Sequence, residues 1–461
     1  MSIDAQTDQS AASPAEELDR LLAAASGHAP VVAGAGIDLQ SVQAGRADLQ
    51  ARDGSDAATW WDPESGGLDL KGAQLQSASL SHAVLSHANL RGADLSGAVA
   101  RGADLSHTIL EQAIFTGADC GGAMFNGSHA GEARFERAML EDARFEGAAL
   151  RYADFKQTLL DGAIFNRADL WGAHLDEADA DEAQFQKARL DESSLRKGNF
   201  SQADFTEASL KKARLDGARL QSANFTGARL EGASLRGADL SRASLPRLNL
   251  ASCDLAHVRL AGAWLENTRL SLDQLGGAVG EERDGEFDAA RQAYIALEQN
   301  FRSLGDGEGE SWAFRKGRTM GKAQKARTAR SLWASRDYAA CFRSALGWAS
   351  DSFVEWLCNY GESLWRVVRA FFTTMLVFAL LYGVTGSLTR AVESAVKARA
   401  VTRDPFDMLV FSFTNMLSTS APDIGLKPAN EAVALLVSVQ GALGIVLIGL
   451  FGYVLGNRMH R

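Results

Sequence analysis

A five-residue repeat runs through the middle of the chain and constrains its fold more than any other feature. Every position divisible by five from Leu70 to Leu270 is the centre of one short unit. The residue two before each centre is Ala in most units, as in Ala93-Asp94-Leu95, and no insertion breaks the register. The centres are Leu or Phe, with the exceptions of Ala100, Cys120, Ala130 and Ala180.

A period of five matches neither the turn of an α-helix nor the two-residue alternation of a β-strand. The two apolar positions of each unit share one interior only if the chain turns a corner at every unit. Four units then make one roughly square coil, with successive coils about 4.8 Å apart. The pattern predicts a solenoid over residues 68–275, with Ala and Leu or Phe stacked in interior columns.

The pattern A(D/N)LXX, matched nearly throughout residues 68–270, resembles that of the pentapeptide-repeat family. The resemblance implies a right-handed quadrilateral β-helix and says little about chemistry. Some members of that family resemble duplex DNA in shape and charge and inhibit DNA gyrase, which is a rival interpretation of the acidic residues 131–192. Arg137, Arg144 and Arg151 interrupt this stretch, so a solvated face is the favoured interpretation.

Residues 1–67 are expected to form an N-terminal tail and a cap on the first coil, because a solenoid end exposes unpaired backbone groups. Trp60 and Trp61 are the predicted apolar plug of that cap. His87 and His107, twenty positions apart, are expected to stack on one outer face. Two imidazoles without a third ligand do not indicate a metal site.

The rest of the repeat offers no catalytic constellation. Cys120 and Cys253 occupy inward positions, where a thiol usually serves as a small core residue. No nucleophile with a base, phosphate-binding loop or metal cluster is recognisable in the sequence. We therefore expect neither an enzyme nor a bound cofactor.

Residues 276–365 are predicted to form a helical, basic linker. Apolar residues of Glu286–Ser303 recur at helical spacing. Residues 315–343 bring nine basic side chains with Trp333 among them, a composition that suits either nucleic acid or anionic lipid. The apolar segments that follow favour lipid, and no nucleic-acid partner is expected.

Two uncharged apolar segments are long enough to cross a membrane as helices. Ala370–Leu388 has 19 residues and Ala432–Gly456 has 25, so we predict spans at about 367–388 and 432–456. The sequence therefore predicts an integral, multi-pass protein whose partner is a lipid bilayer, the cell (inner) membrane.

The orientation follows from basic residues beside the spans. Arg366 and Arg369 precede the first span, and Arg458 and Arg461 follow the second, so both termini are expected to be cytoplasmic. The N-terminus lacks the basic and apolar regions of a secretory signal, which agrees with a cytosolic repeat domain.

A third apolar segment lies between the two spans. Met408–Pro422 is uncharged but too short to cross, which predicts a re-entrant helix at about 405–418. Asp404 is the expected N-cap and Pro405 the first helical residue.

The order of span, short helix, extended turn and Gly-rich span resembles a two-transmembrane P-loop channel. The text FSFTNMLSTSAPDIGLKP looks like a potassium-channel pore helix and filter. The resemblance covers about residues 286–461 and implies that 366–461 form a pore domain that assembles as a homotetramer. The filter then falls on Ser418, Thr419, Ser420, Ala421, Pro422 and Asp423.

This filter lacks both glycines and the aromatic residue that a potassium filter uses to aim its carbonyls at the ion. A ring of four Asp423 carboxylates would favour cations over anions without sorting the alkali metals; the alternative role for Asp423 is a cap of a helix or turn. Candidates for pore lining or gating in the second span are Gln440, Gly444, Gly449 and Gly452. Close helix packing accounts for these glycines equally well, and Gln440 could instead brace the re-entrant helix.

The sequence thus predicts a mixed fold: a pentapeptide-repeat β-helix, a helical linker and a two-transmembrane α-helical P-loop channel-like domain. The predicted function is a weakly selective or non-selective cation channel, whose cytosolic repeat domain acts as a sensor or as an assembly domain of the channel. The alternative is a non-conducting, membrane-anchored scaffold whose β-helix binds a cytosolic protein.

Overall fold

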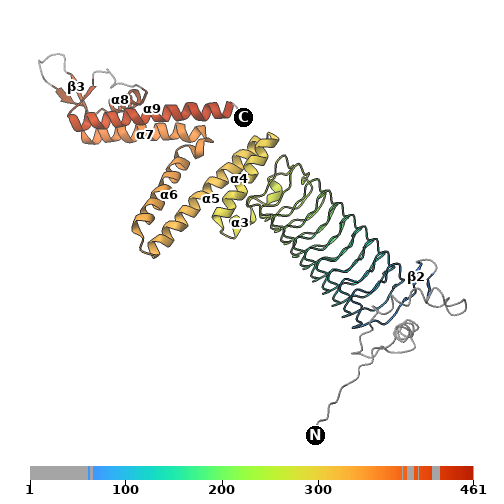
Figure 1. Ribbon diagram of the computed structural model, residues 1–461. Coiled ribbons are helices and arrows are strands. Elements are labelled where there is room, and N and C mark those ends of the chain that lie inside the picture. The colour runs from blue at the N-terminus through green and yellow to red at the C-terminus, as the bar shows by residue number, and fades with distance from the viewer. Residues whose placement is uncertain are drawn as a thin grey trace, which may run out of the picture. The chain divides into compact units, whose positions relative to one another are not determined.

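The computed structural model divides the chain into two compact units, residues 1–320 and 321–461 (Figure 1). The boundary falls within helix α5 (Gly307–Ala334). The residues that the structure describes are 61–62, 66–386, 388–391, 399–402, 404–417 and 426–459.

A short hairpin precedes the solenoid. Strand β1 (Trp61–Asp62) pairs antiparallel with β2 (Gly67–Leu68). Gly67 lies so close to the next coil that a Cβ at this position would meet the carbonyl oxygen of His87 at 2.1 Å. Trp60 and the side chain of Trp61 lie outside the described residues, so the apolar plug stays a prediction.

The solenoid consists of stacked coils joined by parallel β-bridges (Figure 1). Each bridge joins residues twenty positions apart, from Asp69 and Asn89 at one end to Asn249 and Arg269 at the other. Four five-residue units therefore make one coil, as the sequence predicts. The corner of nearly every unit is a turn whose second residue has a positive φ, for example Tyr152 at 58°.

The interior of the solenoid is built from columns of identical positions. The side chain at each unit centre from Leu70 to Leu265 is buried, as is the side chain two residues before each centre from Leu75 onward. Two of the columns are rich in phenylalanine and lie edge to face with each other. Phe155 stacks on Phe135 with 4.8 Å between ring centroids, and it meets Phe145 edge to face at 5.7 Å. Full burial of each such ring contributes roughly 2–3 kcal/mol.

The hydrogen bonds between coils have a net direction. The N–H groups of Leu90 and Gly92 donate to the following coil, whereas that of Asn89 donates to the preceding coil. The same pattern recurs from unit to unit. At the C-terminal end, the last coil is therefore left with more unpaired N–H donors than C=O acceptors.

Three short elements cover this donor-rich end: η3 (Asp273–Leu275), α3 (Gly280–Arg283) and α4 (Phe287–Leu304). Buried Glu281 of α3 accepts, through Oε1, from the N–H groups of Leu260 and Ala261, both at 2.7 Å. Buried Asn300 of α4 accepts from the Thr268 N–H and donates to the Thr268 carbonyl, both at 2.9 Å. The Glu281 carboxylate and the Asn300 amide thus supply hydrogen bonds that the next coil would otherwise make.

The cap predicts an unusual effect of pH on stability. Burial raises the pKa of the Glu281 carboxyl, although the bound N–H groups oppose this. A carboxyl whose pKa is higher in the folded state stabilises the fold below its unfolded pKa, and this contribution is lost as pH rises through the folded pKa. Glu281→Gln retains an accepting Oε1 without the buried charge, so we expect a higher melting temperature than wild type at neutral pH and a smaller difference in acid.

The comparison variant is Asn300→Ala, which removes a cap acceptor without changing charge. It should lower the free energy of unfolding by about 1–3 kcal/mol at every pH, because the Thr268 C=O loses its Asn300 donor and the Thr268 N–H keeps only the Leu265 carbonyl as acceptor. Thermal unfolding of the purified full-length protein across a pH series measures both variants. A Glu281→Gln protein that melts below wild type at neutral pH would contradict the electrostatic argument.

The second unit is helical. After α5, the chain forms α6 (Tyr338–Cys358), η4 (Asn359–Gly361), α7 (Leu364–Thr385) and, at its end, α9 (Glu431–Met459). By length and composition, α7 and residues Glu431–Gly456 of α9 are both able to cross a membrane. The predicted spans, 367–388 and 432–456, coincide with these helices within three residues.

The segment between the two apolar helices holds more regular structure than predicted. Helix α8 (Pro405–Leu417) lies where a helix was predicted, at 405–418, and its re-entrant course stays a prediction. The sequence did not reveal a three-stranded antiparallel sheet of order β4-β3-β5. These strands are too short to show an alternating pattern. Their bounds are Leu388–Ala391 for β3, Arg399–Val401 for β4 and Leu426–Pro428 for β5.

Candidate functional site

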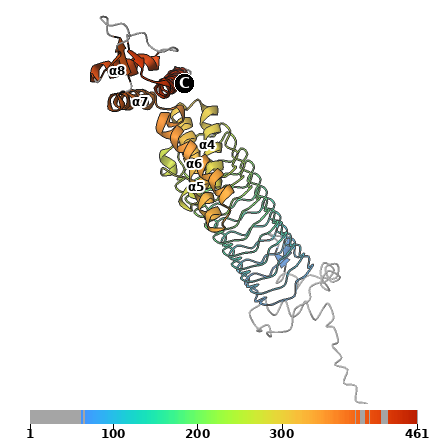
Figure 2. The ribbon, with the colours of Figure 1, turned by 90° about the vertical axis from the view of Figure 1, so that its left-hand side faces the viewer.

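The candidate site is the short helix α8, which packs against both α7 and α9 (Figures 1 and 2). It begins as predicted: Pro405 is its first residue, and the Asp404 carboxylate accepts from the Phe406 N–H at 3.0 Å. Phe411 of α8 is buried in one apolar cluster with Tyr382 of α7 and Val437 of α9. Apolar contacts thus hold α8 between the two long helices.

A buried polar network centred on Gln440 ties α8 to both neighbours. The Gln440 Oε1 accepts from the Tyr382 hydroxyl at 2.8 Å and from the Asn415 Nδ2 at 3.1 Å. The Gln440 Nε2 donates to the Ser412 hydroxyl oxygen at 2.5 Å and to the Ser412 carbonyl at 3.1 Å. Ser412 in turn donates to the Met375 carbonyl at 2.7 Å. Every polar atom of the Gln440 amide is therefore used within one chain.

Two roles were considered for Gln440, lining a pore and bracing the helix α8, and its position in the chain favours the second. Its side chain has no exposed surface, so it braces α8 and does not lie on an open face of the chain. The sequence singled out Gln440 and missed its partners Tyr382, Ser412 and Asn415. The available signal was the occurrence of polar side chains in otherwise apolar helices, which inside a membrane require partners.

The glycines of α9 fall into two groups. At Gly444 a Cβ would meet the backbone of Met416, at the end of α8, with 2.2 Å to its carbonyl oxygen. At Gly449 and Gly452 a Cβ would meet nothing within 4 Å. Gly444 therefore permits the close approach of α8 and α9, whereas pore lining or gating by Gly449 and Gly452 stays a prediction.

The predicted filter, Ser418, Thr419, Ser420, Ala421, Pro422 and Asp423, lies outside the described residues. The residues that the structure describes contain no group of three or more His, Cys, Asp and Glu side chains arranged to hold a metal ion. His87 and His107 stack as expected, with 5.2 Å between their rings. Cys120 and Cys253 are buried.

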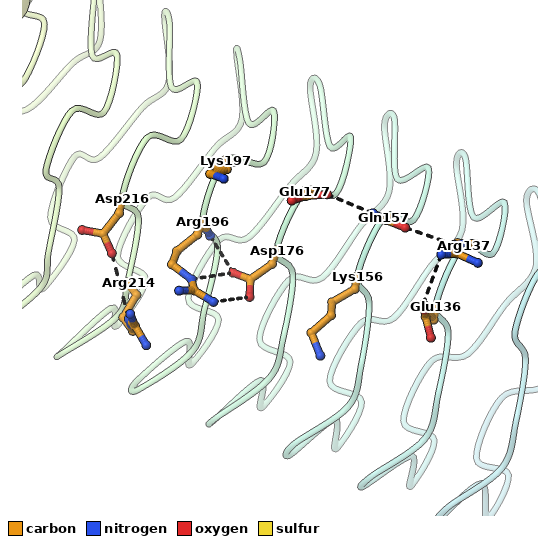
Figure 3. Close-up of a pocket in the computed structure, with 10 residues that line it drawn as sticks. All are labelled: Glu136, Arg137, Lys156, Gln157, Asp176, Glu177, Arg196, Lys197, Arg214 and Asp216. Carbon is orange, nitrogen blue, oxygen red and sulfur yellow. Dashed lines mark hydrogen bonds and ion pairs between the residues drawn. The ribbon is translucent and has the colours of Figure 1, made fainter.

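A second candidate surface is a charged groove of about 540 Å³ across several coils of the solenoid (Figure 3). Arg196 binds Asp176 of the preceding coil, with 3.2 Å between Nη2 and Oδ2. Burial alone would raise the pKa of Asp176, but hydrogen bonds from Arg196 and Ser194 hold it below its usual value. The groove is lined by Glu136, Arg137, Lys156, Gln157, Asp176, Glu177, Arg196, Lys197, Arg214 and Asp216.

Acidic and basic side chains alternate along this groove, and Figure 3 shows several of them paired, among them Arg196 with Asp176 and Arg214 with Asp216. A surface with both signs interspersed does not concentrate one kind of ion. The groove therefore has the character of a solvated face, which is the interpretation favoured for the acidic stretch 131–192.

The similarity to known proteins that we describe lies in the solenoid. The family model for pentapeptide repeats matches eight copies, over residues 69–106, 93–129, 131–167, 163–202, 199–237 and 233–271. The chain belongs to the pentapeptide-repeat family through residues 69–271. The predicted repeat domain is thereby confirmed.

Solved pentapeptide-repeat proteins are similar to part of the chain. HetL, involved in heterocyst differentiation regulation in the cyanobacterium Nostoc sp. strain PCC 7120, is 33% identical over 42% of this chain and 88% of HetL, with a TM-score of 0.42. QnrB1, a plasmid-mediated fluoroquinolone resistance protein, is 19% identical over 37% of this chain and 92% of QnrB1, with a TM-score of 0.18. No curated protein matches the chain.

Proposed function

We propose that this protein is a membrane ion channel-like protein in which four copies of residues 366–461 surround one pore. The observation that supports the proposal is the placement of α8. With 13 residues it is about 20 Å long, too short for a hydrocarbon core of about 30 Å, yet it packs between two helices of spanning length.

Non-helical backbone at membrane depth is tolerated only where protein or a water-filled cavity covers it. A re-entrant α8 therefore has to be held against protein, and the hydrogen bonds of Gln440 hold it against α7 and α9. In the proposal, α8 enters the bilayer from the outer side and the chain returns to that side through residues 418–425. Both termini and the pentapeptide-repeat domain are cytoplasmic, and the membrane is the cell's inner membrane.

In this arrangement, residues Ser418–Asp423 of four chains form the narrow part of the pore. Backbone carbonyls and hydroxyls contact the permeant ion, and four Asp423 carboxylates favour cations at the outer mouth. Without filter glycines, sodium and potassium pass with similar ease. The proposal assigns the protein no catalytic residue, metal or cofactor, and the repeat domain acts as a sensor or an assembly element.

The test is electrical recording of the purified protein in planar bilayers under sodium and potassium gradients. Asp423→Asn is expected to lower cation conductance or the preference for cations over anions, because it removes the charge at the mouth. Glu431→Gln, at the exposed start of α9, is the matched control and should leave the selectivity unchanged. Strong selectivity for potassium over sodium would refute the filter argument.

A second candidate function is a membrane-anchored scaffold whose β-helix binds another protein. It is favoured by an aromatic pair on the solenoid surface: Tyr152 is half exposed and meets Trp171 edge to face at 4.8 Å. Tyr and Trp are the side chains most enriched at the centres of protein interfaces. Absence of current from protein that inserts into bilayers would favour this function over conduction.

A further inference from the structure

Helix α6 turns its polar side chains inward, toward α5. Lys322 of α5 forms an ion pair with Glu355 of α6, and Lys325 Nζ lies 2.6 Å from Asp351 Oδ2. The Ser344 hydroxyl donates to the Lys325 carbonyl at 2.9 Å. A helix of a soluble protein normally buries its apolar stripe and exposes its charges. In α6 the acidic side chains are those that face the protein.

The opposite side of α6 is an exposed aromatic stripe. Phe342 is 69% exposed and Phe353 is 57% exposed, although both are large and apolar. Their spacing to the other members of the stripe places all of them on one helix face. A contiguous apolar surface of this kind marks an interaction site. We name as the aromatic stripe of α6 the residues Tyr338, Phe342, Leu346, Phe353 and Trp356.

The aromatic stripe continues into the contacts that α6 makes with the apolar helices. Leu357 packs against a cluster formed by Ala370 of α7 and Leu447 of α9. Leu346 and Leu357 are eleven residues apart, which is close to three full turns, so they lie on nearly the same face. The aromatic stripe thus lies on nearly the same face of α6 as Leu357, which packs against the apolar residues of α7 and α9.

The course of the chain places α6 at the edge of the membrane. Only residues 359–363 separate α6 from α7, so the start of one helix lies beside the end of the other. α6 then runs across the direction of α7: Figure 2 shows α7 nearly end on and α6 along its length. A helix that crosses a spanning helix at its cytoplasmic end lies along the membrane surface.

Most of the exposed charges near the aromatic stripe are positive, although Asp337, the N-cap of α6, is also exposed. Arg336, Arg343 and Arg369 are exposed, whereas Asp351 and Glu355 are engaged with lysines of α5. Trp365, at the start of α7, is also exposed. Tryptophan prefers the level of the lipid headgroups, and arginine is attracted to anionic headgroups.

We propose that α6 is an interfacial helix, whose aromatic stripe inserts into the headgroup and upper acyl region of the cytoplasmic leaflet. Its partner is the lipid surface itself, with a preference for anionic headgroups. The helix would anchor the linker to the membrane next to the entrance of α7. The inference rests on the proposed insertion of α7 and α9 into a bilayer but does not depend on conduction.

The test uses nitroxide labels on full-length protein in vesicles of phosphatidylcholine and phosphatidylglycerol, in a Cys341→Ser background. Separate proteins carry Phe342→Cys, Phe353→Cys or, as the control, Arg330→Cys on the exposed surface of α5. All three positions are exposed, so the labels should leave the fold intact. Collisions with lipid-soluble oxygen and with a water-soluble nickel complex are compared, and vesicle flotation checks insertion.

At Phe342 and Phe353 we expect oxygen collisions to exceed nickel collisions severalfold, with the reverse at Arg330. High nickel access at the stripe would overturn the inference, since the stripe would face water. Low access to both reagents would also overturn it, since protein, such as a second copy of the chain, would cover the stripe. Oxygen-accessible labels on protein that passes no current would support the interfacial helix while contradicting the channel function.

Discussion

The Phe155→Asp variant is expected to melt far below the wild-type protein. Phe155 has no exposed surface, and its ring contacts Phe135, Phe145 and Phe165. Loss of a buried phenyl group costs about 3–5 kcal/mol, and a carboxylate in its place adds the cost of burying an unpaired polar group. Because each coil is stabilised by its two neighbours alone, the damage extends to both of them.

The matched control is Trp264→Asp, which makes the same aromatic-to-acid change on the outside of the solenoid. Trp264 is 55% exposed, so its replacement should change the free energy of unfolding by about 1 kcal/mol or less. Circular dichroism of the full-length proteins in detergent, followed with temperature, reports the β-helix. Equal melting temperatures for the two variants would contradict the inward assignment of the repeat centres.

The second large effect is expected from a single methyl group at Gly444. Gly444→Ala would place a Cβ 2.2 Å from the Met416 carbonyl oxygen and 2.6 Å from the Met416 Cα. Backbone atoms cannot rotate away, so α8 must move relative to α9. Overpacking of this kind costs roughly 1–3 kcal/mol. It would also strain the Gln440 network, which joins the same two helices.

Two variants of the same helix provide the control, because Gly449→Ala and Gly452→Ala place the methyl group in open space. We expect Gly444→Ala to lose thermal stability and, where wild-type protein conducts, most of its current. The control variants should retain the stability of the isolated chain. A Gly444→Ala protein as stable as Gly449→Ala would show that α8 does not pack on α9 as described.

The solenoid was predictable because its long-range contacts are encoded locally. The partner of any residue in the repeat lies twenty positions away, so the period alone gives the register of every coil. The two apolar helices and α8 were also predictable, from length, charge and the cap at Asp404. In each case the signal lay within one segment or within one repeated interval.

The cap and the Gln440 network were not predictable, because their contacts follow no period. Asn300 replaces a missing coil for Thr268, 32 residues earlier, and Tyr382 meets Gln440 at a separation of 58 residues. Neither pair stands out in the sequence until the helices are placed in space. The sheet formed by β3, β4 and β5 was missed since no strand exceeds four residues. The role of Ser418–Asp423 stays a prediction.

The direction of the hydrogen bonds between coils makes the two ends of a bare solenoid complementary. The last coil offers surplus donors, and the first coil would offer surplus acceptors, so uncapped copies could add head to tail and grow into filaments. Glu281 and Asn300 occupy the donor end with the side chains of the same polypeptide. The cap thereby ends the solenoid at a fixed length, and it protects a repetitive, edge-bearing protein from fibre growth when many copies are crowded together.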